Sequence, residues 1–170
     1  MKTIDISTKK HPGTFAVVDD GDYDALRQHC WYAMQFRRRH VIYAARMESI
    51  DGRRVVVLMH RQVLGCLGRV DHADGDGLNN QRHNLREATA VQNGGNSRKR
   101  ALGTSAFKGV SWHAAAGKWR SQIKSGKKRV HLGLFDDEVA AAMAYDAAAS
   151  AVFGKFAHVN FNKQDGLERA

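Results

Sequence analysis

Four polar residues in the middle of the chain have side chains that could together hydrolyse a phosphodiester bond. Asp71 and His72 are adjacent, and Asn84 and Asn93 follow 12 and 21 residues after His72. An imidazole has an unperturbed pKa near neutral pH and can deprotonate a water molecule. A carboxylate and an amide oxygen can hold a hard divalent cation, which neutralises charge on phosphoryl oxygens. The local sequence predicts a strand, a turn, a second strand and a helix that begins near Thr89.

Residues 70–96, VDHADGDGLNNQRHNLREATAVQNGGN, resemble the HNH nuclease motif of the His-Asn-Asn subtype, found in homing endonucleases with the ββα-metal fold. The resemblance implies that His72 is the general base and that Asn84 holds the loop and orients His72. It also implies that Asp71 and Asn93 hold one Mg²⁺ or Mn²⁺ ion. The implied activity is site-specific cleavage of double-stranded DNA. Four further Asn and His residues share this stretch with Asn84: Asn79, Asn80, His83 and Asn96.

The same stretch also permits a purely structural interpretation, because DGDG and NN are ordinary turn sequences. A calcium-binding EF-hand loop is excluded, since its pattern cannot be threaded through Asp71, Asp74 or Asp76. The combination of VDH, NLR and a later Asn favours the nuclease interpretation over turn chemistry alone.

Length and composition indicate a globular chain with two compact domains. The chain has 170 residues, of which 43% are hydrophobic and 26% are charged. Its two cysteines, Cys30 and Cys66, form no Cys-x-x-Cys pair and give no disulfide framework or cysteine-based zinc finger. The N-terminus has no apolar segment typical of a signal peptide. We therefore expect a cytoplasmic protein of a bacterium or a phage-infected host, and not a secreted one.

The net charge of +10 is concentrated in one segment. Between Asn93 and Phe135 there is no Asp or Glu, and the segment contains ten of the 27 basic residues. The remaining basic residues therefore equal the 17 acidic residues in number. Such a localised excess favours a polyanionic partner, and nucleic acid before a membrane, because no basic amphipathic helix accompanies it.

The first 96 residues are expected to form the nuclease domain, with a β-rich N-terminal portion. Short strands are predicted within residues 13–46, and an apolar strand and a short helix within residues 53–68. The basic run at residues 37–40 either touches a phosphate backbone or forms a solvated hairpin tip. His60, in the short helix, either approaches the metal site or is a structural histidine.

Residues 97–106 are predicted to be a basic linker, because small residues surround Arg98, Lys99 and Arg100. These three side chains either lie on DNA between two docked domains or only keep a connector soluble. Residues 163–170 are expected to be a polar tail.

Residues 107–162 are predicted to fold as three strands followed by one helix. The strand candidates, FKGVSW, KWRSQIK and KRVHLG, are separated by Gly-containing turns. The helix is expected from about Asp136 to Phe153, with acidic residues in its first turn and a narrow stripe of residues facing the sheet. That stripe consists of Ala141, Tyr145, Ala148 and Val152. The whole chain is accordingly predicted to be α+β, with a ββα-metal domain and a three-stranded antiparallel sheet packed on one helix.

The second module resembles the plant ethylene-response-factor (Apetala-type) DNA-binding domain. The matching pieces are FKGV, GKW, HLGLFD, AAMAYDAAA and the final VNF, which together cover most of residues 107–161. The resemblance implies that the sheet lies in the DNA major groove. It implies the following DNA-contacting residues: Lys108, Ser111, His113, Lys118, Trp119, Arg120, Gln122, Lys124 and Arg129. Ser111 and His113 stand where the plant domain commonly has arginines, so the plant base preference is not transferred.

Trp119 has two interpretations. Alternation along KWRSQIK places Lys118, Arg120, Gln122 and Lys124 on one face and Trp119 on the other, which favours a core position. The resemblance instead favours contact with DNA.

Together these observations predict a site-specific DNA endonuclease of the homing-endonuclease kind, targeted by its C-terminal sheet. Its partner is expected to be double-stranded DNA, on which a homodimer could form. The alternative is a non-catalytic, sequence-specific DNA-binding protein that resembles a transcription factor. A third possibility is an RNA-binding accessory protein, which a basic sheet alone would permit.

Overall fold

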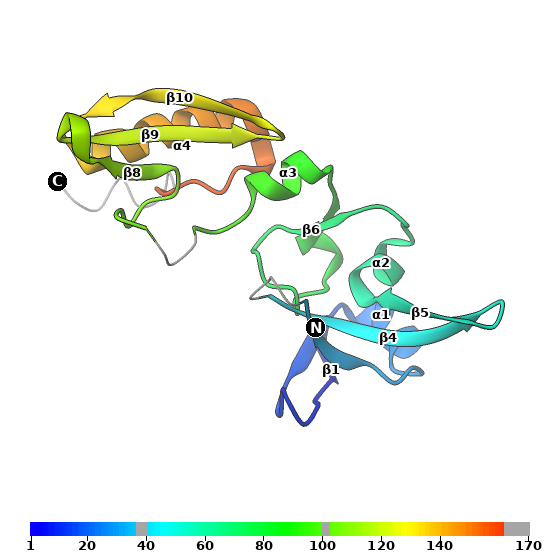
Figure 1. Cartoon of the computed structure of the whole chain (residues 1–170). Helices are drawn as coiled ribbons and strands as arrows, with labels where there is room; N and C mark the ends of the chain where they lie inside the picture. Colours follow the sequence, from blue (N-terminus) through cyan, green and yellow to red (C-terminus); the bar gives the residue numbers. More distant parts are fainter. Residues whose placement is uncertain (37–40, 100–102, 162–170) are drawn as a thin grey trace. The chain divides into compact units, whose positions relative to one another are not determined.

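The computed structural model describes residues 1–36, 41–99 and 103–161, and the chain divides into two compact units (Figure 1). Unit 1 comprises Met1–Ala88 and unit 2 comprises Thr89–Ala170. The basic run at residues 37–40, Arg100 of the linker and the tail lie outside the described residues. Within the described ranges, no helix is both long and apolar enough to cross a membrane.

Unit 1 consists of small antiparallel sheets and two short helices. A hairpin of β1 and β2 precedes α1, a three-stranded sheet of order β3-β4-β5 follows, and then come α2 and the β6–β7 pair. The bounds are β1 Lys2–Asp5, β2 Phe15–Val18, α1 Asp20–Leu26, β3 Tyr32–Gln35, β4 Ile42–Ile50, β5 Arg53–Leu58, α2 Met59–Leu64, β6 Val70–His72, a 3-10 turn Arg82–Asn84 and β7 Leu85–Glu87. The strand β1 was not among the sequence predictions.

The core of unit 1 joins these elements around Ile6, Val18 and Met59, which are fully buried. Trp31 is also buried, and its indole Nε1 donates a hydrogen bond to the carbonyl oxygen of Leu26 at 2.8 Å. A buried indole N–H needs such an acceptor, because leaving it unpaired away from water costs free energy. These contacts hold the N-terminal hairpin and α1 in the same core as α2 and the β6–β7 pair.

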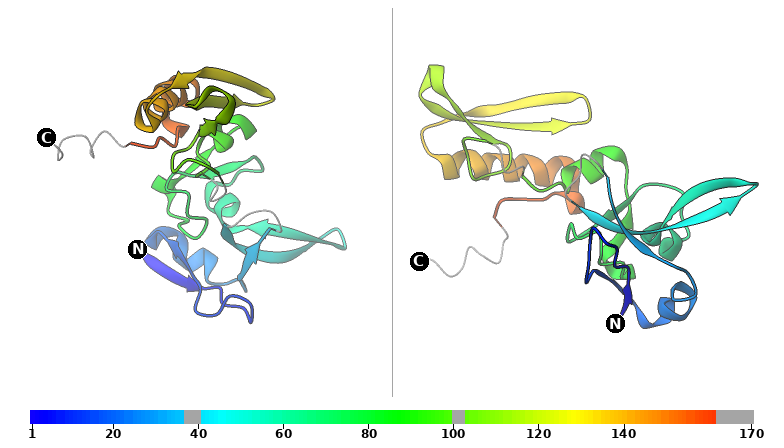
Figure 2. Two further views of the ribbon diagram at one scale, coloured as in Figure 1. Left: turned by 60° about the vertical axis from the view of Figure 1, so that its left-hand side comes forward. Right: turned by 60° about the horizontal axis from the view of Figure 1, so that its bottom comes forward.

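Unit 2 is a three-stranded antiparallel sheet of order β10-β9-β8 with α4 across one face (Figure 2). The bounds are α3 Ala90–Gly95, β8 Val110–His113, a 3-10 turn Ala114–Ala116, β9 Lys118–Ser125, β10 Lys128–Phe135, α4 Glu138–Phe153 and a 3-10 turn Gly154–Phe156. The three strands and the long helix agree with the elements predicted from the sequence.

Small residues let α4 lie close on the sheet. Ala141, Ala142 and Ala149 are completely buried. The helix begins as its acidic first residues predict, since the Asp137 side chain accepts a hydrogen bond from the Ala140 backbone N–H at 2.7 Å. The buried stripe differs from the predicted one near the C-terminus, where Phe153 is buried and Val152 is about half exposed.

The buried end of α4 is explained by α3, which packs against it. Gly95 lies so close to the Phe153 ring that a Cβ on this glycine would come within 2.6 Å of it. The Gly95 carbonyl also accepts hydrogen bonds from Lys108 Nζ at 2.6 Å and from the His158 backbone N–H at 3.1 Å. A capping box at Thr89 and Gln92 begins α3. Residues 89–95 therefore belong to unit 2, whereas the sequence analysis grouped them with the first domain.

The α+β class and the antiparallel sheets agree with the prediction. The finer assignment of residues 70–96 to a ββα-metal arrangement is not supported. The predicted helix of that arrangement is α3, and α3 packs against α4, β9 and the 3-10 turn Gly154–Phe156.

Candidate nucleic-acid interface

The strand register of unit 2 sorts its side chains onto two faces. In an antiparallel sheet, directly paired residues point to the same side, and neighbours along a strand alternate. Val110 pairs with Ser121, and both are buried together with Ile123 on the face that α4 covers. The opposite side, here called the open face, carries Ser111, His113, Lys118, Arg120, Gln122, Lys124, Arg129, His131 and Leu134.

The open face is polar and basic. Four of its nine side chains are Lys or Arg, two are His, and none is acidic. Arg120 is held over β8 because its guanidinium donates a hydrogen bond to the Ser111 hydroxyl at 3.2 Å. Lys118 forms an exposed ion pair with Asp136 at 3.0 Å. Such surface pairs contribute little free energy, so Lys118 can exchange this partner for another anion at low cost.

Two nitrogen atoms on the open face are buried and lack a protein partner among the described residues. They are Nε of Arg120 and Nδ1 of His113. A buried polar atom without a hydrogen bond is costly and calls for a specific explanation, such as a ligand or water that completes it. Both atoms lie on the strands β8 and β9.

Trp119 lies on the face that α4 covers. It pairs with Trp112, their rings meeting edge to face at 5.1 Å, and it packs against the core formed by Val110 and Ala141. Its side chain is therefore placed as alternation indicates, and not among the open-face residues.

The remaining predicted DNA contacts are on the segment that leads into β8. The Lys108 amine lies 5.8 Å from the centroid of the Tyr145 ring and donates a hydrogen bond to the Gly95 carbonyl. Burial lowers the pKa of the Lys108 amine to about 8, and the carboxylate of Asp146 only partly offsets this. Lys99 contacts the carbonyl of Ser105, and Arg98 is also in the described part of the linker.

His131 and Leu134 also lie on the open face and were not among the predicted DNA-contacting residues. His131 pairs with Gln122 and shares the parity of Arg129, so alternation along β10 could have identified it. Leu134 could not be found in this way, because a β-bulge between His131 and Gly133 shifts the register.

The residues predicted for catalysis fall in both units. Asp71, His72 and Asn84 lie on or beside β6 and β7 of unit 1, and Asn93 lies on α3 of unit 2. Asn84 holds the loop that follows β6. Its side chain accepts a hydrogen bond from the Asp74 backbone N–H at 3.0 Å and donates to the Asn79 carbonyl at 2.8 Å.

Asp71 and His72 are both buried. The carboxylate of Asp71 forms an ion pair with Arg86 at 2.7 Å. The His72 ring lies 5.0 Å from that of His60, and Tyr43 packs against both. Burial lowers the pKa of His72, and it lowers the pKa of His60 to about 3. Across the portions of the chain that the structure describes, no group of three His, Cys, Asp or Glu side chains is arranged to hold a metal ion.

Comparison with known proteins identifies a domain within unit 2. The family model of the AP2 domain matches residues 105–155. These residues form an AP2 domain. They include all three strands of the sheet and nearly all of α4.

The similar relatives are plant proteins. APETALA2-like protein 2 of Oryza sativa subsp. indica is 48% identical over 63 residues, which cover 36% of this chain and 14% of that protein. The AP2-like ethylene-responsive transcription factor TOE2 of Arabidopsis thaliana is 43% identical over 58 residues, covering 34% and 12%. The AP2/ERF and B3 domain-containing transcription repressor TEM1 of the same plant is 38% identical over 73 residues, covering 43% and 20%. The match thus spans a fifth or less of each relative.

These comparisons contradict the predicted endonuclease. The family match lies in the AP2 domain, the relatives are named as transcription factors and a repressor, and no finding supports an HNH nuclease domain. The predicted motif rested on the spacing of polar residues along the chain. The same stretch is rich in DGDG and NN sequences, which also occur in ordinary turns, so spacing alone does not establish a catalytic site. The Mg²⁺ or Mn²⁺ ion stays a prediction.

Proposed function

We propose that this chain is a non-enzymatic, sequence-specific protein that binds double-stranded DNA through the open face of its AP2 domain. The observation that carries the proposal is the open face itself. It holds four cations and two imidazoles with no carboxylate, and Arg120 and His113 each keep a buried nitrogen that no described protein group satisfies. The names of the plant relatives, transcription factors and a repressor, support the same class of function.

The chemistry of the open face suits both affinity and readout. Arg and Gln can form paired hydrogen bonds with base edges, whereas Lys mainly neutralises phosphates. Arg120 and Gln122 are two residues apart on the central strand, so they reach successive positions along one groove. Lys118, Lys124 and Arg129 lie around them and supply phosphate contacts.

Duplex DNA is a better partner than duplex RNA on geometric grounds. The B-form major groove is about 12 Å wide and admits strands of a sheet, whereas the A-form major groove is too narrow and deep for side chains to read. A sheet that presents its central strand outward therefore favours B-form DNA.

The test is to select binding sites for the full chain from a random duplex library, and then to compare Arg120→Ala with the wild type by fluorescence anisotropy. We expect Arg120→Ala to weaken binding to the selected duplex by about 1–3 kcal/mol and to relax the base preference at one position. Lys10→Ala removes one exposed charge from unit 1 and serves as the control; it should leave the base preference unchanged.

Two results would oppose the proposal. One is a selection that yields no enriched sequence although the protein is folded. The other is preferential binding to an RNA duplex over the DNA duplex of the same sequence at equal salt. The stoichiometry of the selected complex will show whether one or two copies of the chain bind each site.

A further inference from the structure

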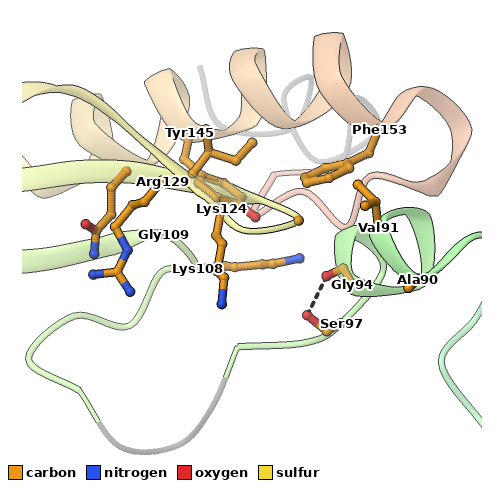
Figure 3. A pocket seen from close by; sticks show the side chains of 13 residues that line it. Ala90, Val91, Gly94, Ser97, Lys108, Gly109, Lys124, Arg129, Tyr145 and Phe153 are labelled. Atoms are coloured by element: carbon orange, nitrogen blue, oxygen red, sulfur yellow. Dashed lines mark hydrogen bonds between the residues drawn. The ribbon is translucent and has the colours of Figure 1, made fainter.

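A pocket of about 540 Å³ lies inside unit 2, between α3, α4 and the β9–β10 hairpin (Figure 3). Its apolar wall is formed by Val91 of α3 and by Tyr145 and Phe153 of α4. Lys108, Lys124 and Arg129 provide its charge, and among the described residues that line it none is acidic. Figure 3 shows Lys108 extended across the pocket toward Gly94, with Tyr145 and Phe153 on the α4 side.

The pocket exists because α3 packs beside the sheet. Gly95 contacts Phe153, and Val91 lies within ordinary van der Waals range of the hairpin glycine Gly126. Residues 90–97 contribute part of the lining, and these residues lie outside the segment that matches the AP2 family model. Such a pocket is therefore not explained by the three strands and the long helix alone.

The pocket shares three residues with the open face. Gln122, Lys124 and Arg129 belong both to the open face and to the lining, and Lys124 pairs directly with Arg129 across β9 and β10. Cations that would face a duplex on the open face therefore also line the pocket.

The Lys108 ammonium in the pocket has N–H donors that an anion could accept. The Lys108 ammonium has three N–H donors, of which the Gly95 carbonyl accepts one. The carboxylate of Asp146 acts electrostatically on this amine, and its oxygens already accept hydrogen bonds from the backbone N–H groups of Asn160 and Phe161. Burial lowers the pKa of Lys108, and a bound anion would oppose that effect.

We infer that this pocket is an anion site that holds a backbone phosphate of the bound duplex, and that α3 is therefore part of the DNA-binding unit. The inference rests on the proposed function, since it places the phosphate on the duplex that occupies the open face. The chemistry requires a phosphate group and no particular base, so the site adds affinity without sequence preference.

Gly94 offers a direct test. A Cβ at Gly94 would meet no atom within 4 Å, so a longer side chain can be accommodated where it lines the pocket. Gly94→Glu should weaken binding to the selected duplex about tenfold relative to Gly94→Gln, because it places a carboxylate beside the phosphate. The slope of log K against log salt should also become less negative by about 0.9, the contribution of one phosphate. Gly68→Glu, in unit 1, adds the same charge elsewhere and is the control.

A second measurement uses inorganic phosphate alone and does not depend on DNA binding. In the full chain, the backbone amide resonances of residues 90–97 and 108 should shift saturably with phosphate in the wild type and in Gly94→Gln, and not in Gly94→Glu. If Gly94→Glu proves unfolded by circular dichroism, Lys108→Gln takes its place in this titration.

The outcomes separate the two proposals. If the wild type selects no duplex but its pocket resonances respond to phosphate, the proposed function fails and the anion site stands with a free phosphate ligand as its occupant. If the wild type binds the duplex but Gly94→Glu and Gly94→Gln bind it with the same affinity and salt slope, the inference that the pocket holds a backbone phosphate is overturned. If the pocket resonances also ignore phosphate, the anion site itself is overturned.

Discussion

Gly109, which precedes β8, shows at the scale of a residue how closely the sheet and α4 approach each other. Its φ is +80°, a conformation that side chains rarely adopt, and a Cβ here would lie 1.9 Å from the Tyr145 ring. Both effects oppose any larger residue. The Gly109 carbonyl also accepts a hydrogen bond from the Gln122 backbone N–H at 2.9 Å, so a shift of this backbone would disturb the central strand.

We predict that Gly109→Ala lowers the free energy of unfolding of unit 2 by about 3 kcal/mol or more, through backbone strain and overpacking together. Gly117→Ala is the matched control, because Gly117 also has a positive φ, +60°, but no atom lies within 4 Å of its Cβ position. Gly117→Ala should lower the free energy of unfolding by only about 1 kcal/mol. Urea unfolding followed by tryptophan fluorescence measures the free energy of unfolding of both variants. An equal decrease in the two variants would show that contact with Tyr145 is unimportant.

The amine of Lys108 predicts a pH dependence of stability. Its pKa is about 8 in the folded chain and about 10.5 when exposed in the unfolded chain, mainly because burial disfavours the charged form. Between these values the unfolded state binds more protons, so the free energy of unfolding should rise as pH increases from about 8 to about 10. Below pH 8 both states are protonated, and the full cost of the buried charge is present.

The measurement compares urea midpoints of the wild type and Lys108→Met at pH 7.5 and pH 9.5. The wild type should gain stability relative to Lys108→Met at the higher pH. Lys124→Met, which removes an exposed amine, should show no such difference from the wild type. A parallel pH response in the wild type and Lys108→Met would contradict the assignment.

At the scale of elements, the segment that follows α4 is attached by hydrogen bonds to α4 and to the residue that precedes Gly109. The Asp146 carboxylate on α4 accepts hydrogen bonds from the backbone N–H groups of Asn160 and Phe161, at 2.8 Å and 2.9 Å. The Asn160 side chain in turn accepts from the Lys108 backbone N–H at 2.6 Å and donates to the Lys108 carbonyl at 3.1 Å. This network joins α4, the final segment and the entrance to β8.

We predict that Asp146→Ala lowers the free energy of unfolding of unit 2 by about 2–4 kcal/mol, because it leaves several N–H donors without their charged acceptor. Asp136→Ala should change stability by less than about 1 kcal/mol, since Asp136 is 86% exposed and forms only a surface ion pair. Hydrogen exchange at the Phe161 amide provides a local readout, and unchanged protection in Asp146→Ala would refute the role of the carboxylate.

Local patterns predicted the elements of unit 2 well. Alternation and Gly-containing turns identified three strands, and the acidic start of α4 located its first turn. Alternation also assigned Trp119 to the covered face. The β-bulge before Gly133 and the burial of Phe153 by α3 were not predictable, because each depends on contacts between segments that are distant in sequence.

At the scale of the whole molecule, the charge distribution follows the two units. The ten basic residues between Asn93 and Phe135 all belong to unit 2, and those on the open face and in the pocket lie among them. This feature was visible in the sequence and pointed to a nucleic-acid partner. The prediction of an enzyme had a weaker basis, because it depended on the spacing of polar residues in a stretch whose sequence is also typical of ordinary turns.

The contacts of Gly95 and Asn160 also determine which residues a transferable fragment of unit 2 needs. Both residues lie outside residues 105–155, the segment that matches the family model. A fragment trimmed to those limits would lose α3, which forms part of the pocket wall, and the backbone N–H donors of Asn160 and Phe161 that bind Asp146. A fusion or domain-swap experiment should therefore carry residues 89–161 as one transferable piece.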